Sequence, residues 1–116
     1  MARIVAVHEL ELKAGVDRAR FERVVRRRIA GLGLQMPGLV ERRFLRGYKG
    51  ARSGEYAMLW VFESRAALEA MFGPPERPER GPEAFVRYEE AIGPYLAAPS
   101  PELIRFTDYL EIDGYP

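Results

Sequence analysis

The strongest constraint on the fold is a stretch that is apolar on both sides, GEYAMLWVFES, residues 54–64. Successive side chains of an extended strand point to opposite faces, so this stretch divides into two rows. The bulky row consists of Tyr56, Met58, Trp60 and Phe62. The small row consists of Ala57, Leu59 and Val61. A strand with two apolar rows must be covered twice, by helices on one face and by helices or a second subunit on the other.

Length and composition indicate one globular domain, residues 1–116. The chain has 47% apolar and 30% charged residues, and no apolar run approaches the roughly 20 residues that span a bilayer. We therefore expect no membrane partner. The first predicted strand begins close to Met1, so we expect no signal peptide, and the absence of cysteine fits a cytoplasmic protein.

The sequence also lacks the residues for several kinds of site. Without cysteine there are no thiolate metal sites or cysteine nucleophiles, and one histidine cannot form a multi-histidine centre within a chain, so we expect no metal. A net charge of +1 provides no overall attraction for polyanions. Glu22 sits among a cluster of helical arginines that has no aromatic platform, so we expect no nucleic-acid partner. These arginines are Arg23, Arg26, Arg27 and Arg28.

Hydrophobic periodicity and turn residues predict seven elements. In chain order they are strand 3–12, helix 17–32, strand 39–48, strand 54–64, helix 64–72, helix 83–96 and strand 102–112. Asp17 and Ser64 are placed to cap the first two helices, because their side-chain oxygens can accept hydrogen bonds from free backbone N–H groups. The proline-rich segment 73–82 is either a lid over a pocket or an inert loop.

The order of these elements predicts an α+β, ferredoxin-like βαββαβ fold. Each half is a strand–helix–strand unit, and such crossovers are almost always right-handed. The four strands then form one antiparallel sheet with the helices on one face. The other face stays bare, and we expect it to carry the bulky row, which a soluble monomer would rarely expose.

Three segments resemble a known superfamily: KAG at 13–15, MPG at 36–38, and the stretch at 54–64 that runs into the second helix. The chain is similar, over residues 3–72, to the antibiotic-biosynthesis-monooxygenase-like branch of the dimeric α+β barrel superfamily. The resemblance implies a homodimer in which two open sheet faces meet to form a barrel. It also implies a pocket, either between the sheet and the helices or inside the barrel.

Members of this superfamily differ in activity, so the resemblance does not fix the reaction. They include cofactor-independent monooxygenases of polyketide quinols, haem-degrading monooxygenases and muconolactone isomerases. In the haem-degrading members an asparagine, a tryptophan and a histidine form the functional site. In this sequence the asparagine position is occupied by His8 and the tryptophan position by Phe62. The histidine position is occupied by Glu89 or Tyr88, so the axial histidine is missing. We expect no cofactor, although His8 itself could ligate haem iron.

His8 is the candidate catalytic residue, as a general base or polar anchor near neutral pH. The alternative is a half-buried histidine with a structural hydrogen bond to the backbone or to a partner subunit. The candidate substrate-binding residues are Tyr56, Met58, Trp60, Phe62, Tyr88 and Asp108. An inward Asp108 needs a partner, which we expect to be Arg43, Arg105 or His8, and a structural ion pair is the favoured interpretation.

Two functions are compatible with these residues. The first is binding of a small aromatic or polyketide-like compound, with cofactor-independent monooxygenation in which His8 removes a proton and the substrate anion reduces oxygen. The second is a non-catalytic homodimeric module in which the bulky row is only the dimer core.

Overall fold

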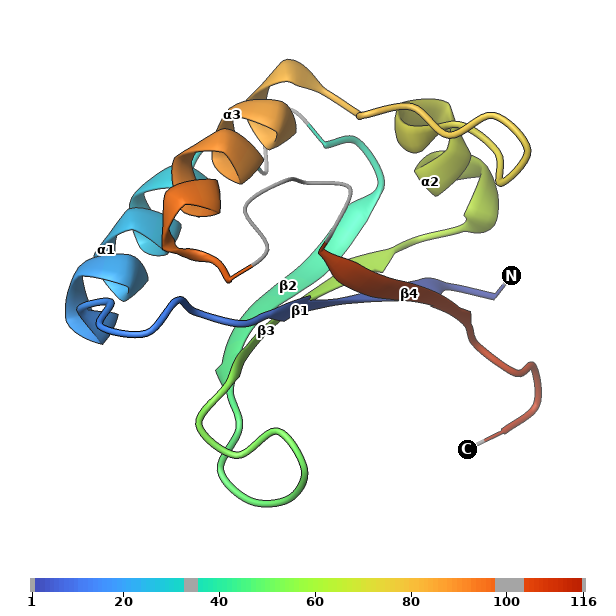
Figure 1. Ribbon diagram of the computed structural model, residues 1–116. Coiled ribbons are helices and arrows are strands. Elements are labelled where there is room, and N and C mark those ends of the chain that lie inside the picture. Colours follow the sequence, from blue (N-terminus) through green and yellow to red (C-terminus); the bar gives the residue numbers. More distant parts are fainter. Residues whose placement is uncertain (1, 33–35, 98–103, 116) are drawn as a thin grey trace.

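One antiparallel sheet organises the computed structural model, which describes residues 2–32, 36–97 and 104–115. The strands are β1 (Ile4–Leu10), β2 (Leu39–Arg46), β3 (Tyr56–Phe62) and β4 (Arg105–Leu110), in the order β2-β3-β1-β4. The helices are α1 (Arg18–Ile29), α2 (Arg65–Phe72) and α3 (Glu83–Ile92), followed by a 3-10 turn, η2 (Gly93–Tyr95). All of them lie against one face of the sheet (Figure 1). The predicted ferredoxin-like fold is confirmed.

Both predicted helix caps are present. A carboxylate oxygen of Asp17 accepts a hydrogen bond from the backbone N–H of Arg20 at 3.2 Å. The hydroxyl of Ser64 accepts one from the backbone N–H of Ala67 at 3.1 Å. Each bond satisfies a donor that the first turn of a helix leaves free, so these two residues fix where α1 and α2 begin.

Some predicted strands and helices extend beyond the observed ones. Strand β1 ends at Leu10, beyond which Leu12 makes only an isolated bridge to Leu96. Strand β4 covers Arg105–Leu110, and residues 102 and 103 of the predicted strand lie outside the described residues. Helix α1 ends at Ile29 rather than near residue 32. Such differences are usual at element ends, where periodicity carries the least information.

The bulky row of β3 lies under the helices and not on the bare face. Its four residues are only 1–2% exposed: Tyr56, Met58, Trp60 and Phe62. The expectation that this row covers the open face, and with it the idea that the row is the dimer core, is wrong. Alternation shows which residues share a face, but it does not show which face the helices cover. Here the space between sheet and helices takes the larger side chains.

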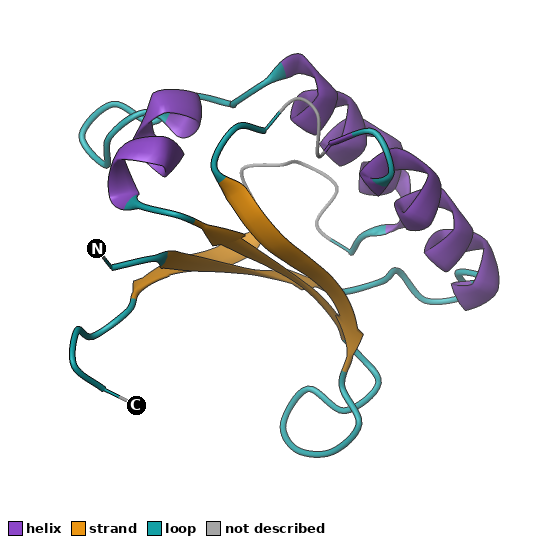
Figure 2. Cartoon of the chain, turned by 180° about the vertical axis from the view of Figure 1, so that it is seen from behind, coloured by secondary structure: helices purple, strands orange, loops and turns teal. Residues whose placement is uncertain are grey.

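The open face of the sheet carries the small row instead, and none of the described helices covers it (Figure 2). The register places β-branched and aromatic residues of the neighbouring strands on this face. They include Val5 and Val7 of β1 and Tyr109 of β4. Tyr109 is 56% exposed, and every residue of the edge strand β4 is exposed.

No helix within residues 2–32, 36–97 and 104–115 is long and apolar enough to cross a membrane.

The cap of α1 provides a test of this local structure. We expect Asp17→Ala to lower the free energy of unfolding by about 1 kcal/mol, because a backbone donor loses its partner. Asp17→Asn is the matched control, since the amide oxygen can still accept the hydrogen bond. Urea unfolding measures both. Equal losses for the two variants would show that the carboxylate does not act as a cap.

Candidate functional site

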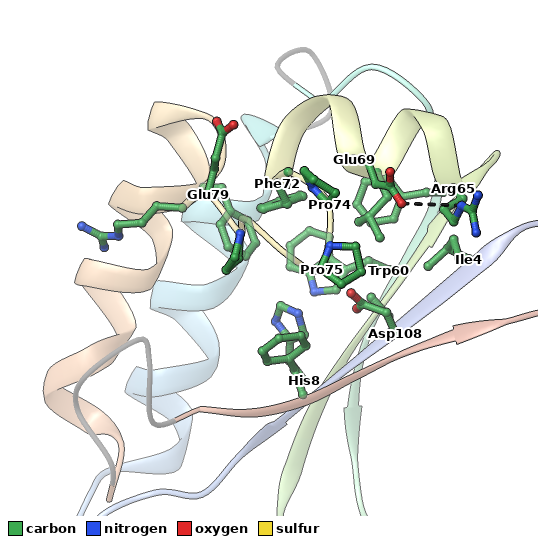
Figure 3. Close-up of a pocket in the computed structure, with 18 of the residues that line it drawn as sticks. Ile4, His8, Trp60, Arg65, Glu69, Phe72, Pro74, Pro75, Glu79 and Asp108 are labelled. Atoms are coloured by element: carbon green, nitrogen blue, oxygen red, sulfur yellow. Dashed lines mark ion pairs between the residues drawn. The ribbon is translucent and has the colours of Figure 1, made fainter.

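A cavity of about 790 Å³ lies between the sheet and the helical layer. Its floor is formed by β1, β3 and β4, and α2, the start of α3 and segment 73–80 enclose it (Figure 3). The volume is in the range of small-molecule sites. Its lining is mostly apolar, with a few polar groups among the rings and prolines, which is the usual composition of such sites.

Segment 73–80 lines this cavity, so of the two sequence interpretations the structure favours a cover over the pocket. The backbone turns back at Gly73, whose φ is +75°. A Cβ there would lie 2.4 Å from the carbonyl oxygen of Arg77, so only glycine allows this close approach. The N–H of Glu79 then donates to the carbonyl of Phe72 at 2.7 Å, and Pro74, Pro75 and Pro78 face the cavity.

His8 projects from the middle of β1 into a collar of aromatic rings (Figure 3). Its ring centroid is 6.0 Å from that of Trp60, 6.1 Å from that of Phe85 and 5.9 Å from that of Phe106. These rings come from β3, α3 and β4. A flat ligand next to the imidazole would therefore meet aromatic surface from three elements.

The imidazole of His8 makes no hydrogen bond to another residue of the described chain. The structural hydrogen bond of the alternative interpretation is therefore not formed within this part of the chain. Burial lowers the pKa of His8 from 6.5 to about 4, because the charged form loses hydration. At neutral pH the ring is neutral and can accept one hydrogen bond and donate another.

Asp108 faces the same cavity from β4. In the register, Ala6 lies opposite Asp108 and His8 lies opposite Phe106, so Asp108 and His8 are diagonal neighbours on one face of the sheet. Partial desolvation raises the pKa of the Asp108 carboxyl.

The prediction that Asp108 forms an ion pair with an arginine is wrong. Arg43 pairs with Glu41 on the opposite face of the sheet. Arg105 stands opposite Glu9 in the register, and this also places it on the opposite face. Because side chains of a strand alternate, neither arginine can reach the cavity. No ion pair of Asp108 forms within the described ranges.

The other predicted site residues separate into two groups. Trp60 and Phe62 line the cavity together with His8 and Asp108. Tyr56, Met58 and Tyr88 are buried and do not line it.

Tyr56 and Tyr88 have different surroundings within the core. The hydroxyl of Tyr56 donates to Glu22 on α1 at 2.5 Å. The hydroxyl of Tyr88 is buried with no partner in the described chain, and this burial raises the pKa of Tyr88. The indole N–H of Trp60 is likewise buried without a partner there.

Sequence reasoning missed the contribution of α2, and it left open whether the segment that follows α2 covers a pocket. Arg65, Leu68, Glu69 and Phe72 of α2 line the cavity, and Arg65 forms an ion pair with Glu69 at 3.5 Å. The mixture of proline and charge in GPPERPERGP, residues 73–82, is the signal that could have pointed to this wall.

The charged lining residues are four acids and two arginines. The acids are Glu69, Glu79, Glu89 and Asp108, and the arginines are Arg65 and Arg80. With His8 neutral, their formal charges sum to −2 (two positive, four negative). Across the described ranges, no three His, Asp or Glu side chains are grouped so that they could hold a metal ion.

No protein-family model matches the chain, and no curated protein matches it either. Solved structures do. A dimeric ferredoxin-like protein of unknown function from Jannaschia sp. CCS1 matches with a TM-score of 0.65 and 21% identity, over 95% of this chain and 99% of that one. A provisionally named antibiotic biosynthesis monooxygenase from Caulobacter crescentus CB15 matches with a TM-score of 0.63 and 21% identity, over 95% and 88%. This chain has the same fold as these two proteins.

A third match is SnoaB, a cofactor-independent oxygenase from Streptomyces nogalater, with a TM-score of 0.62 and 16% identity over 100% of this chain and 97% of that one. The structural relatives are thus ferredoxin-like dimeric proteins and proteins resembling antibiotic biosynthesis monooxygenases, as the sequence motifs indicated. At these identities the likeness establishes the fold and leaves the reaction to be argued from the site.

The environment of His8 can be measured directly, because it is the only histidine. We expect its ring proton resonance to titrate with a pKa of about 4 in the folded protein and about 6.5 in concentrated urea. The unfolded state then binds the proton more readily, so the free energy of unfolding decreases as the pH falls from about 6.5 toward 4. A folded-state pKa near 6.5 would show that the imidazole is well hydrated.

Proposed function

We propose that the protein is a homodimeric α+β barrel that binds a small aromatic or polyketide-like compound in the cavity beside His8. The main support is the collar of Trp60, Phe85 and Phe106 around an imidazole without a hydrogen-bond partner in the described chain. A flat apolar ligand gains buried area from rings on three elements, and it can exchange one hydrogen bond with His8.

The open sheet face supports the dimer. Val5, Val7 and Leu59 lie on this face together with Tyr109, which is 56% exposed, and no helix of the described residues covers it. Exposed apolar surfaces of this kind usually mark an interface. Two of the matching solved structures are described as dimeric. The residues that we assign to the interface are those of the small row and its neighbours, and not those of the bulky row.

We propose oxygenation as the reaction of this site, on the support of the likeness to SnoaB and of a neutral imidazole in an aromatic cavity. His8 accepts a proton from an acidic CH₂ group of the substrate, and the carbanion reduces dioxygen. The CH₂ becomes a carbonyl, and each O₂ consumed places one oxygen atom in the product and releases the other as water. Neither a metal nor a flavin is required.

A pKa of about 4 makes His8 a weak base in the empty cavity, so the ligand must strengthen it. An anion formed next to the imidazolium provides this help, because opposite charges at close range raise the pKa of a histidine. If the ligand provides no such anion, the protein is a binding module without catalysis, which is the second candidate function.

Ligand binding can be tested with two exposed aromatic residues on opposite faces of β4. Phe106 lines the cavity, whereas Tyr109 lies on the open face. We expect Phe106→Ala to weaken binding of phenethyl alcohol about tenfold, because a wall of the collar is lost. The matched control Tyr109→Ala should leave binding unchanged.

The readout is the indole N–H resonance of Trp60, which is unique because the chain has one tryptophan. If phenethyl alcohol does not shift this resonance, or if both variants lose binding equally, the cavity is not the binding site.

The dimer interface has its own test. We expect Leu59→Arg to produce a monomer, because it places a charge in the centre of the proposed apolar interface. Tyr48→Arg is the control, since Tyr48 is 93% exposed in the loop between β2 and β3. Light scattering coupled to gel filtration gives the mass of each. A monomeric parent protein, or a dimeric Leu59→Arg variant, would contradict the proposed interface.

A further inference from the structure

The charges around the cavity favour a cationic ligand over an anionic one. The lining carries more acidic than basic side chains, and of its two arginines Arg65 is already paired with Glu69. Walls of low dielectric strengthen the effect of such an imbalance. An anionic aromatic would enter against this field, whereas a protonated amine would be attracted.

Asp108 provides the specific contact for that amine. Its carboxylate points into the cavity and has no ion pair or hydrogen bond within the described ranges. The two arginines that could have paired with it, Arg43 and Arg105, lie on the other face of the sheet. His8, its diagonal neighbour, is neutral. Asp108 belongs to an exposed strand, so water can hydrate this carboxylate in the empty cavity, and the group is free to bind a cation that enters.

The rings around Asp108 suit a cation as well. Trp60, Phe85 and Phe106 present aromatic surface next to His8, and the faces of such rings attract ammonium groups. A carboxylate combined with several aromatic rings is a favourable setting for an organic amine.

A second, independent group of the cavity wall also lacks a partner. Trp60 is 1% exposed, and its indole N–H makes no hydrogen bond within the described chain. A buried donor without an acceptor is costly, so an acceptor on the ligand, such as a hydroxyl or carbonyl oxygen, would stabilise it. The unpaired donor on β3 and the unpaired carboxylate on β4 both point to a polar ligand.

We propose that the cavity takes an aromatic amine, with its protonated nitrogen on the Asp108 carboxylate and its ring among Trp60, Phe85 and Phe106. The inference rests on the proposed ligand site and names the class of compound that occupies it. It assigns to Asp108 the role of counter-ion, so this residue determines which aromatic compounds the cavity prefers.

The experiment compares three aromatic probes of similar size and different charge. Phenethylamine is the cation, phenethyl alcohol the neutral compound and phenylacetate the anion. Each is titrated into the full-length protein near neutral pH, and the shift of the Trp60 indole resonance gives its affinity. We expect phenethylamine to bind about tenfold more tightly than phenethyl alcohol, and phenylacetate to bind most weakly.

The Asp108→Asn variant keeps the shape of the side chain and removes its charge. We expect it to abolish the preference for the amine and to leave the affinity for phenethyl alcohol unchanged. Asp113→Asn, an identical change in the exposed segment after β4, is the matched control and should keep the preference. Circular dichroism melting curves verify that both variants are folded.

The outcomes separate this inference from the proposed function. If the three probes bind equally, if the anion binds best, or if the preference for the amine survives in Asp108→Asn, the inference is overturned while the proposed aromatic site stands. If no probe binds, both the site and the inference are wrong.

Discussion

Burial of the bulky row of β3 beneath the helices is the interaction on which the rest of the structure depends. At one end of the row, Phe21 of α1 packs against Tyr56 at 5.2 Å between ring centroids, and Tyr95 of η2 packs against Phe21 at 5.8 Å. This end is filled by aromatic side chains. At the other end, Phe62 meets Phe72 of the short helix α2 at 6.2 Å, and the layer above the sheet opens into the cavity. One strand therefore supplies both the centre of the core and part of the floor of the site.

The polar groups of the cavity derive their character from this apolar setting. His8 is neutral because burial disfavours its charged form, and the same loss of hydration raises the pKa of Asp108. These two neighbours therefore differ less in proton affinity than the free side chains do. Neither has a hydrogen-bond partner in the described chain, so their polar atoms remain available to a ligand. A site of this kind suits a ligand that brings its own charge or hydrogen-bond donor.

The two faces of the sheet have different roles. The helix-covered face holds the core and the cavity, and the open face carries smaller apolar side chains that suit contact with another flat apolar surface. Strand β4 contributes side chains to both faces, because Phe106 borders the cavity while Tyr109 lies on the open face. A partner that covers the open face would therefore also reach the strand that holds Asp108.

The sequence by itself determined the order of the elements, the antiparallel sheet, the gathering of the helices on a single face, and the caps at Asp17 and Ser64, because local spacing, crossover handedness and turn chemistry control these features. It also singled out His8, Trp60, Phe62 and Asp108, all of which line the cavity, since a single histidine and large rings on strands are conspicuous. Only the tertiary structure decided which face of β3 the helices cover. Alternation is symmetric between the two faces, and the choice depends on packing against residues distant in the sequence. For the same reason, the contribution of α2 and the absence of an arginine beside Asp108 became visible only once strand register and loop path were fixed.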